Sequence, residues 1–321
     1  MSIITSLNTA QIASLSTATL ATLNSADWRA FNTDQIAALT TAQVAALPVL
    51  AIASFTTAQF LGFEVADLAA FSTRSIRSMN TAQIGVLTSD QVAGLRTDQI
   101  TAFSTSQITG LSTDGIAALT TSQAAVLSLA QMTMLGSAQV AAFETEDLRS
   151  ITTQALRGMT SAATAALTSD QIQALTTSQT LALTSTQIRA LGSDQIIALS
   201  TDQFAVLSTA QVAAMTTAQV QAIDSGDIAS LGSANLRALN TAQVRALGSE
   251  QVQGLSTAQA AALTSTQTAA MTTNQVAALE TDDLRAIVTN AFATLNSANI
   301  AALLTDQVQA LMTRQVAVLN S

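Results

Sequence analysis

The sequence predicts an all-α solenoid of very short helices, one in each eight-residue repeat, forming a single continuous array over residues 1–321. Three observations lead to this prediction. First, 40 apolar residues recur every eight residues from Leu7 to Leu319, and each is Leu, Phe, Met or Ile. Second, a helix-capping pattern recurs within the repeat. Third, acidic and basic residues occupy separate positions in it. Self-similarity at a fixed period indicates a repeat architecture.

The repeat is numbered here from its large apolar residue, which is position 1. Ser or Thr prevails at positions 2 and 3, Ile or Val at position 6 and Ala at position 8, as in Leu39–Leu47. Position 5 is Gln in 25 of the 39 complete octads. Positions 2 and 5 therefore predict a capping box. In it the hydroxyl accepts the position 5 N–H, and the Gln side chain accepts the position 2 N–H.

Two other backbone conformations fit the octad poorly. Eight residues advance an α-helix by about 800°, so in a continuous helix the apolar series would spiral around the surface. Positions 1, 6 and 8 do not alternate with period two, and Ala and Gln are poor strand formers, which disfavours a β-solenoid. A short helix over positions 3 to 8 and the next position 1 places position 6 and that position 1 on one face.

Charged residues support a helix start and a helix end within each octad. All 20 carboxylates lie at positions 2, 4 or 5. Eight of the 11 Arg residues lie at position 7: Arg29, Arg77, Arg149, Arg157, Arg189, Arg237, Arg245 and Arg285. This distribution complements the helix dipole. Helices of six or seven residues are unstable alone and must stack on neighbours. We expect two octads per coil, with antiparallel helices burying both apolar faces.

The composition excludes several classes of function. The chain has no Cys, His, Tyr or Lys, so the usual catalytic bases and nucleophiles and thiolate metal ligands are missing. We therefore expect no enzyme, no cofactor and no small-molecule substrate, and we place the single Trp28 in the core. The net charge of −9 disfavours nucleic acid as a partner. No apolar run reaches the roughly 18–20 residues of a membrane span, and no N-terminal signal peptide is visible.

Five octads carry Asp at position 5, namely Asp27, Asp67, Asp147, Asp227 and Asp283. We interpret them as acidic caps inherited through duplication of a longer block. The alternative is a weak Ca²⁺ site, for which the candidates are Glu144, Glu146, Asp147, Glu280, Asp282 and Asp283. Calcium requires six to eight oxygen ligands, so three neighbouring carboxylates are a weak signal. Arg149 and Arg285 lie in the same octads and could pair with these acids.

The two chain ends together complete one octad. Leu319 to Ser321 supply positions 1 to 3, and Ser2 to Ser6 supply positions 4 to 8, before Leu7. This predicts a head-to-tail homopolymer, an open filament unless its rotation closes a ring. The expected self-assembly interface is Ser2, Ile3, Ile4, Leu7, Leu311, Leu319, Asn320 and Ser321. Position 2 is apolar at Val288, Leu304 and Met312. We interpret this as sequence drift in terminal repeats, and the alternative is a lateral contact with a partner or another copy.

The Leu39–Leu47 motif and its variants resemble the Ala/Thr/Gln-rich octapeptide tracts of long proteobacterial secreted or surface proteins described as adhesin-like or haemagglutinin-like. The resemblance spans nearly the whole chain. It implies a structural role at the cell surface or outside the cell, with export that needs no N-terminal signal peptide. A filament subunit is the leading interpretation. A non-catalytic spacer, scaffold or adhesin-type binding module is the alternative, and an ice- or surface-binding array is a third.

Overall fold

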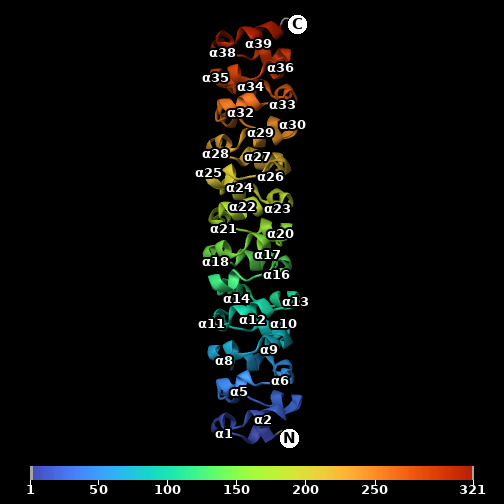
Figure 1. Ribbon diagram of the computed structural model, residues 1–321, viewed down its shortest axis with the longest axis vertical. Helices are drawn as coiled ribbons and strands as arrows, with labels where there is room; N and C mark the ends of the chain where they lie inside the picture. Colours follow the sequence, from blue (N-terminus) through green and yellow to red (C-terminus); the bar gives the residue numbers. More distant parts are fainter. Residues whose placement is uncertain (1–2, 320–321) are drawn as a thin grey trace. The chain divides into compact units, whose positions relative to one another are not determined.

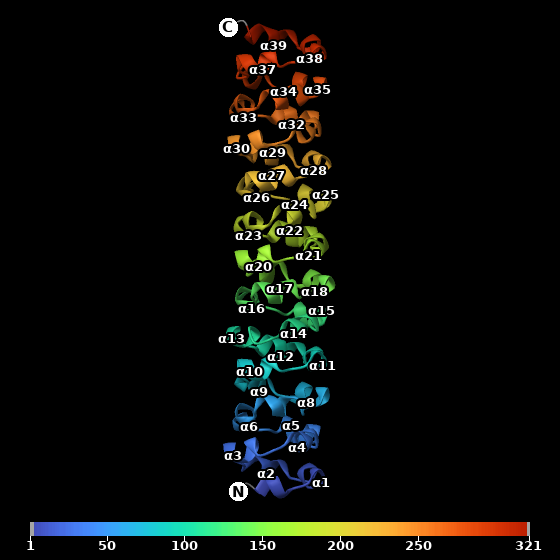
Figure 2. The ribbon, with the colours of Figure 1, turned by 180° about the vertical axis from the view of Figure 1, so that it is seen from behind.

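The computed structural model describes residues 3–319, which fall into two compact units, Met1–Leu167 (unit 1) and Thr168–Ser321 (unit 2). Over the described range every octad from Leu7 onwards contains one α-helix, and no strand occurs. Figures 1 and 2 show the short helices of each unit from two sides. The prediction of an all-α solenoid with one helix per octad is confirmed.

The helices of unit 1 are η1 (Ile3–Ser6, a 3-10 helix), α1 (Thr9–Ala13), α2 (Thr17–Ala21), α3 (Ser25–Arg29), α4 (Thr33–Ala37), α5 (Thr41–Ala45), α6 (Val49–Ser54), α7 (Thr57–Phe60), α8 (Val65–Ala70), α9 (Thr73–Ser78), α10 (Thr81–Gly85), α11 (Ser89–Ala93), α12 (Thr97–Ala102), α13 (Thr105–Ile108), α14 (Thr113–Ala117), α15 (Thr121–Ala124), α16 (Leu129–Met134), α17 (Ser137–Ala141), α18 (Thr145–Ser150), α19 (Thr153–Leu156) and α20 (Ser161–Ala165). Those of unit 2 are α21 (Ser169–Ala174), α22 (Thr177–Ala182), α23 (Ser185–Ala190), α24 (Ser193–Ile197), α25 (Thr201–Ala205), α26 (Thr209–Ala214), α27 (Thr217–Ala222), α28 (Ser225–Ser230), α29 (Ser233–Ala238), α30 (Thr241–Ala246), α31 (Ser249–Gln253), α32 (Thr257–Ala262), α33 (Ser265–Ala270), α34 (Thr273–Ala278), α35 (Thr281–Ala286), α36 (Thr289–Phe292), α37 (Ser297–Ala301), α38 (Thr305–Ala310) and α39 (Thr313–Val318).

Each α-helix begins at position 3 of its octad, and α23 shows how the octad starts and stops it. The N-cap Thr184 is extended, with φ −71° and ψ 157°, and its hydroxyl accepts the Gln187 N–H at 3.2 Å. Leu191 at the next position 1 is also extended, with φ −64° and ψ 141°, and its N–H donates to the Ile188 carbonyl at 3.2 Å. Position 1 therefore ends the helix and does not extend it, so the helices are shorter than predicted.

Three octads form one coil, and the prediction of two octads per coil was wrong. Each helix packs against the helix three octads later within its unit, as in α5 with α8, α15 with α18, α23 with α26 and α32 with α35. The physical reason is the extended backbone between successive helices, such as that at Leu191 and Gly192, positions 1 and 2 of one octad. These extended residues turn the chain by about one third of a circle, so two octads do not bring the chain back above its starting point. A third helix is needed to surround the apolar side chains.

The core of each unit is made of the side chains at positions 1 and 6. Ile36 and Leu39 are buried in unit 1, and Ile188 and Leu191 are buried in unit 2. This confirms that position 6 and the following position 1 share one face. Burial of two large side chains from every octad gives short helices the tertiary packing that they need for stability.

An aromatic cluster fills several successive core layers of unit 1. Trp28 is fully buried, as predicted, and stacks on Phe31 with ring centroids 5.3 Å apart. Its Nε1 is buried without a hydrogen-bond partner. Edge-to-face contacts continue the cluster from Trp28 to Phe55 at 5.6 Å, from Phe55 to Phe63 at 5.4 Å and from Phe63 to Phe71 at 5.3 Å. These rings bury large apolar areas in favourable geometries.

Some position 8 residues must be small because they touch the backbone of the coil below. A Cβ added to Gly158 would lie 2.4 Å from the Leu129 carbonyl oxygen, and one added to Gly254 would lie 2.6 Å from the Ser225 oxygen. We expect Gly158→Ala to lower the free energy of unfolding by about 1–3 kcal/mol, because the backbone must move. Gly232 is an N-cap with nothing within 4 Å of its added Cβ.

We expect Gly232→Ser to raise the free energy of unfolding, by about 0.3 kcal/mol, by supplying the missing capping oxygen. Urea denaturation followed by circular dichroism measures both variants. Equal stability of Gly158→Ala and the wild type would show that the coils are not closely packed at this point.

Candidate assembly interface and the ladder that leads to it

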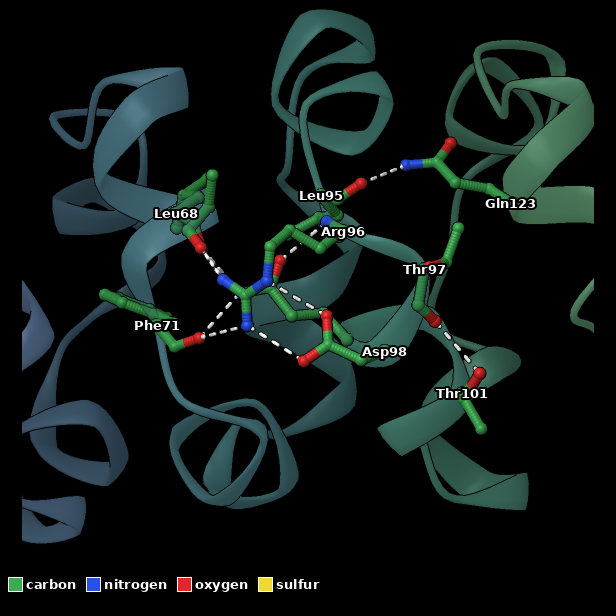
Figure 3. Close-up of polar contacts among 10 residues, drawn as sticks. Leu68, Phe71, Leu95, Arg96, Thr97, Asp98, Thr101 and Gln123 are labelled. Carbon is green, nitrogen blue, oxygen red and sulfur yellow. Dashed lines mark hydrogen bonds and ion pairs between the residues drawn. The ribbon is translucent and has the colours of Figure 1, made fainter.

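A buried glutamine side chain joins each coil to the one below it, as Gln123 of α15 shows. Its Oε1 accepts the Thr120 backbone N–H at 2.8 Å and completes the predicted capping box. Its Nε2 donates to the backbone carbonyl of Val92 at 2.9 Å and to that of Leu95 at 2.6 Å; Figure 3 shows the bond to Leu95. Leu95 follows the C-cap Gly94 of α11, and no backbone N–H of the described residues donates to its carbonyl. One amide therefore caps a helix and binds the end of an earlier helix.

The same pair of bonds recurs in both units, always to the carbonyls 31 and 28 residues earlier. Examples are the side chains of Gln35, Gln59, Gln83, Gln107 and Gln131 in unit 1, and of Gln203, Gln219, Gln251, Gln275 and Gln307 in unit 2. These glutamines, with their two acceptor carbonyls, are called the glutamine ladder.

Sequence reasoning found the cap and missed the ladder. The sequence did contain a signal of the ladder. Glu completes a capping box as well as Gln does, yet no octad has Glu at position 5. Only an amide can also donate.

Asparagine at position 5 makes a shortened version of the ladder bond. The Asn235 Nδ2 donates to the Leu207 carbonyl at 2.7 Å, and the Asn299 Nδ2 donates to the Met271 carbonyl at 3.0 Å. Both acceptors lie 28 residues before the Asn. The side chain is one methylene shorter than that of Gln, and its amide bonds to this one carbonyl. It follows that a group with the size of Asn can still hold a coil to the position 1 carbonyl below it.

The position 5 aspartates differ in burial. Asp67, Asp147 and Asp283 are buried, and burial is the main cause that raises the pKa of each carboxyl above its usual value of 3.8. The Thr41 hydroxyl donates to Asp67 at 3.1 Å and opposes this shift in pKa. Asp227 is half-buried and accepts the Thr201 hydroxyl at 2.7 Å. These residues lie at helix starts, as predicted, but an ionised carboxylate cannot supply the donor of the ladder.

The structure does not support the calcium candidates. Successive helical residues point about 100° apart, so positions 2, 4 and 5 face different directions. Asp147 points into unit 1, whereas Glu146 is exposed and lies 4.0 Å from Arg149. In the other triplet, of Glu280, Asp282 and Asp283, Asp282 lies 3.5 Å from Arg285. Among residues 3–319, no three acidic side chains are grouped so that they could hold a metal ion.

Arg96 is an unusual cap because a basic residue occupies position 2. Its guanidinium donates to the backbone carbonyls of Ala69 and Phe71, one coil earlier, and pairs with Asp98 at 3.0 Å (Figure 3). The hydrogen bond from Arg96 lowers the pKa of Asp98. Gln99 still binds the Arg96 N–H at 2.8 Å and still joins the ladder. Arg96 thus adds a second link between the same coils.

The residues predicted for self-assembly do not all form exposed surfaces. Ile3 is 68% exposed, but Ile4 is buried, and its carbonyl accepts the Gln35 amide at 2.9 Å. Leu7 and Leu311 are half-buried, and Leu319 is exposed. Ile4 is therefore a core residue of unit 1 and not a contact residue. The remaining predicted positions, Ser2, Asn320 and Ser321, lie outside the described residues.

Sequence reasoning did not identify residues that are exposed at octad positions whose side chains are buried elsewhere in the same unit. Val308 and Val316 occupy position 6 in the last coil of unit 2 and are 53% and 43% exposed, whereas Val276 at the same position is 0% exposed. In unit 1, Gln11 at position 5 is exposed, and its amide donates to none of the described residues. Three octads per coil is the information that identifies these residues. It shows that Val308 and Val316 belong to the three octads at the C-terminal end of the described residues.

The residues predicted for a lateral contact separate into two places in unit 2. Val288 is exposed and Met312 half-buried, and they cap α36 and α39, which pack on each other. Leu304 is also exposed, but it caps α38, which packs on α35. The structure thus brings Val288 and Met312 to successive coils of one stack and places Leu304 on another. These three side chains do not form one patch.

Short helices, three octads per coil and an internal ladder define an α-solenoid repeat protein. Comparison with protein families identifies the repeat. The model of the ALTTAQ repeat matches residues 17–49, 60–97, 92–129, 140–177, 181–209, 220–257, 245–273 and 276–313. These matches cover well over half of the sequence, and the chain belongs to the ALTTAQ repeat family. A search of curated proteins finds no match. Within residues 3–319, none of the helices has the length and apolar character needed to cross a bilayer.

Proposed function

We propose that this protein is a non-enzymatic structural subunit that associates head to tail into a filament. In this arrangement the last coil of unit 2 in one copy binds the first coil of unit 1 in the next copy. The observation that carries the proposal is the exposure of Val308 and Val316 at a position that is buried throughout the interior of unit 2. Another copy would bury these side chains as the next coil does inside a unit.

Hydrogen-bonding groups on the two faces complement each other in the same way. The carbonyls of Leu303 and Leu311 receive no ladder amide from the described residues. The Gln11 amide in unit 1 is a ladder donor whose acceptors are missing from the described part of the same chain. A contact that pairs these groups repeats the chemistry of the interior, in which position 1 carbonyls such as those of Leu247 and Leu279 accept a ladder amide. A heterologous contact of this kind propagates as an open filament or closes as a ring.

The role that we propose is extracellular or at the cell surface. Its support is the resemblance of the octads to repeat tracts of secreted and surface proteins. The absence of His, Cys, Lys and Tyr from the sequence supports a structural role without catalysis.

Negative-stain electron microscopy and sedimentation of the purified chain test the filament. We expect long thin fibres from the wild type, because each added copy buries two half-exposed valines. We expect Val308→Asp combined with Val316→Asp to abolish the fibres, because two carboxylates would have to be desolvated in the contact. The matched control is Ile197→Asp, which changes an apolar residue that is 62% exposed at position 7 within unit 2.

Ile197→Asp should assemble like the wild type. Single copies of the wild type at all concentrations, or fibres from the double valine variant, would refute the proposed contact. Binding of single copies to cells or to a surface ligand would instead support a spacer or an adhesin-type module.

A further inference from the structure

Asp283 occupies a ladder position, but its side chain lacks the ladder's donor when it is ionised. It lies at position 5 of α35 and is buried, and a bond from the Thr257 hydroxyl reaches its carboxyl group. The other carboxyl oxygen, Oδ2, is buried and has no hydrogen-bond partner. By the spacing of the ladder, the carbonyl 28 residues earlier is that of Leu255. Leu255 follows the C-cap Gly254 of α31, and no backbone N–H of the described residues donates to its carbonyl.

The chain contains two amide versions of this arrangement. Asn235 and Asn299 have the same size as aspartic acid, and each donates to the carbonyl 28 residues earlier. A protonated carboxyl has one O–H donor where Asn has an N–H donor. We infer that Asp283 is a proton-dependent link between coils, in which the protonated carboxyl donates from Oδ2 to the Leu255 carbonyl and the ionised carboxylate leaves this junction without its bond.

Asp67 occupies the equivalent position in unit 1, but its carboxyl group accepts hydrogen bonds from the Thr41 hydroxyl and the Glu64 backbone. It is buried at position 5 of α8, and the carbonyl 28 residues earlier is that of Leu39. Leu39 likewise ends a helix and precedes an N-cap. Asp227 lies at the same position in α28 but is half-buried and accepts a hydrogen bond from Thr201 at 2.7 Å. The chain therefore provides an internal control for Asp283.

The charged groups around Asp283 favour a proton on it. Burial is the largest cause that raises the pKa of Asp283, the Thr257 hydrogen bond opposes it, and the negative charges of Glu280 and Asp282 raise it further. Arg285 is in the same helix but pairs with Asp282 at 3.5 Å, and Arg314 of α39 donates to the Arg285 carbonyl at 3.5 Å. The helices that pack on α35, and α31 before them, bring no further basic residue. α32 carries no charged residue, α38 carries Asp306 and α31 carries Glu250.

The direction of the pH effect follows from linkage. The carboxyl of Asp283 binds its proton more tightly in the folded chain than in the unfolded chain, where its pKa is near 3.8. Its contribution to stability is therefore complete below that value and is lost as pH rises through the folded pKa. Acid should tighten the junction at Asp283, and neutral pH should loosen it. An Asn at the same position should keep its bond at every pH.

Two measurements test this inference on the full chain. Carbon-13 NMR of the labelled protein follows the Asp carboxyl carbons through a pH titration. We expect Asp283 to titrate at a higher pH than the exposed Asp282. Titration of Asp283 at or below the midpoint of Asp282 would overturn the inference, and this measurement needs no variant.

The second measurement compares urea midpoints of Asp283→Asn and the wild type at about pH 3.5 and about pH 7. We expect equal midpoints in acid and a higher midpoint for the variant at neutral pH. The control Asp227→Asn should show no such gain, because Asp227 is only half-buried. An Asp283→Asn variant that gains nothing at neutral pH, or that gains equally at both pH values, would overturn the link.

Discussion

Replacing Gln219 with leucine should lower the free energy of unfolding of unit 2 by about 3 kcal/mol. The Gln219 side chain is buried, accepts the Thr216 N–H at 2.7 Å, and donates to the carbonyls of Ile188 and Leu191 at 2.7 Å each. Leucine has a similar volume but makes none of these bonds. The loss leaves a buried N–H and a buried position 1 carbonyl without partners, which costs more than a net hydrogen bond contributes.

The matched control is Gln221→Leu in the same helix. Gln221 lies at position 7 and is exposed, so its replacement should change the stability by less than about 0.5 kcal/mol. Gln219→Glu separates the two roles of the side chain. It keeps the acceptor for the Thr216 N–H and loses the donor at neutral pH, so it should be destabilised at neutral pH and recover in acid. Urea denaturation at both pH values measures this. Equal stability of Gln219→Leu and Gln221→Leu would show that the ladder contributes little.

Replacing Phe63 with alanine should destabilise unit 1 by about 3–5 kcal/mol. Phe63 is buried and contacts Phe55 at 5.4 Å, Phe60 at 5.7 Å and Phe71 at 5.3 Å. Removal of its ring leaves a cavity among side chains from several coils. In a solenoid each repeat contacts only its neighbours, so loss of protection in amide hydrogen exchange should concentrate in the coils around α7 and α8.

Leu61→Ala is the control for the aromatic core. Leu61 lies two residues before Phe63 and is exposed, so its truncation should leave stability and exchange nearly unchanged. A loss of exchange protection spread evenly over unit 1 after Phe63→Ala would contradict neighbour-only coupling. A loss below about 1 kcal/mol would show that the ring is not tightly packed.

Features that arise within a single octad could be predicted from the sequence. The helix start at position 3, the hydroxyl cap at Thr184 and the Gln187 side chain on the N-cap N–H all depend on residues at most three apart. The placement of acidic residues in the first turn and of Arg in the last turn independently predicted the same helix start and end within the octad. Burial of Ile188 and Leu191 also followed from spacing, since residues three apart share one face of a helix.

Features that depend on which octads become neighbours could not be predicted in the same way. The two extended residues at Leu191 and Gly192 turn the chain by an angle that no single octad specifies. The sequence reasoning therefore assumed two octads per coil where the fold has three. The wrong coil size concealed the ladder, because the acceptors of Gln219 lie 31 and 28 residues away. It also concealed the exposure of Val308 and Val316, because the residues of the last coil can be identified only when the number of octads per coil is known.

The sequence by itself determined a helical repeat of eight residues, its caps and its apolar face, because these follow from backbone geometry and contacts within one turn. Only the tertiary structure decided the size of the coil, the donor role of the position 5 amide and the layer in which core side chains remain exposed. Those properties depend on the sum of small turns over many residues. A local pattern fixes each turn only approximately, whereas the packing of one coil on the next fixes the total.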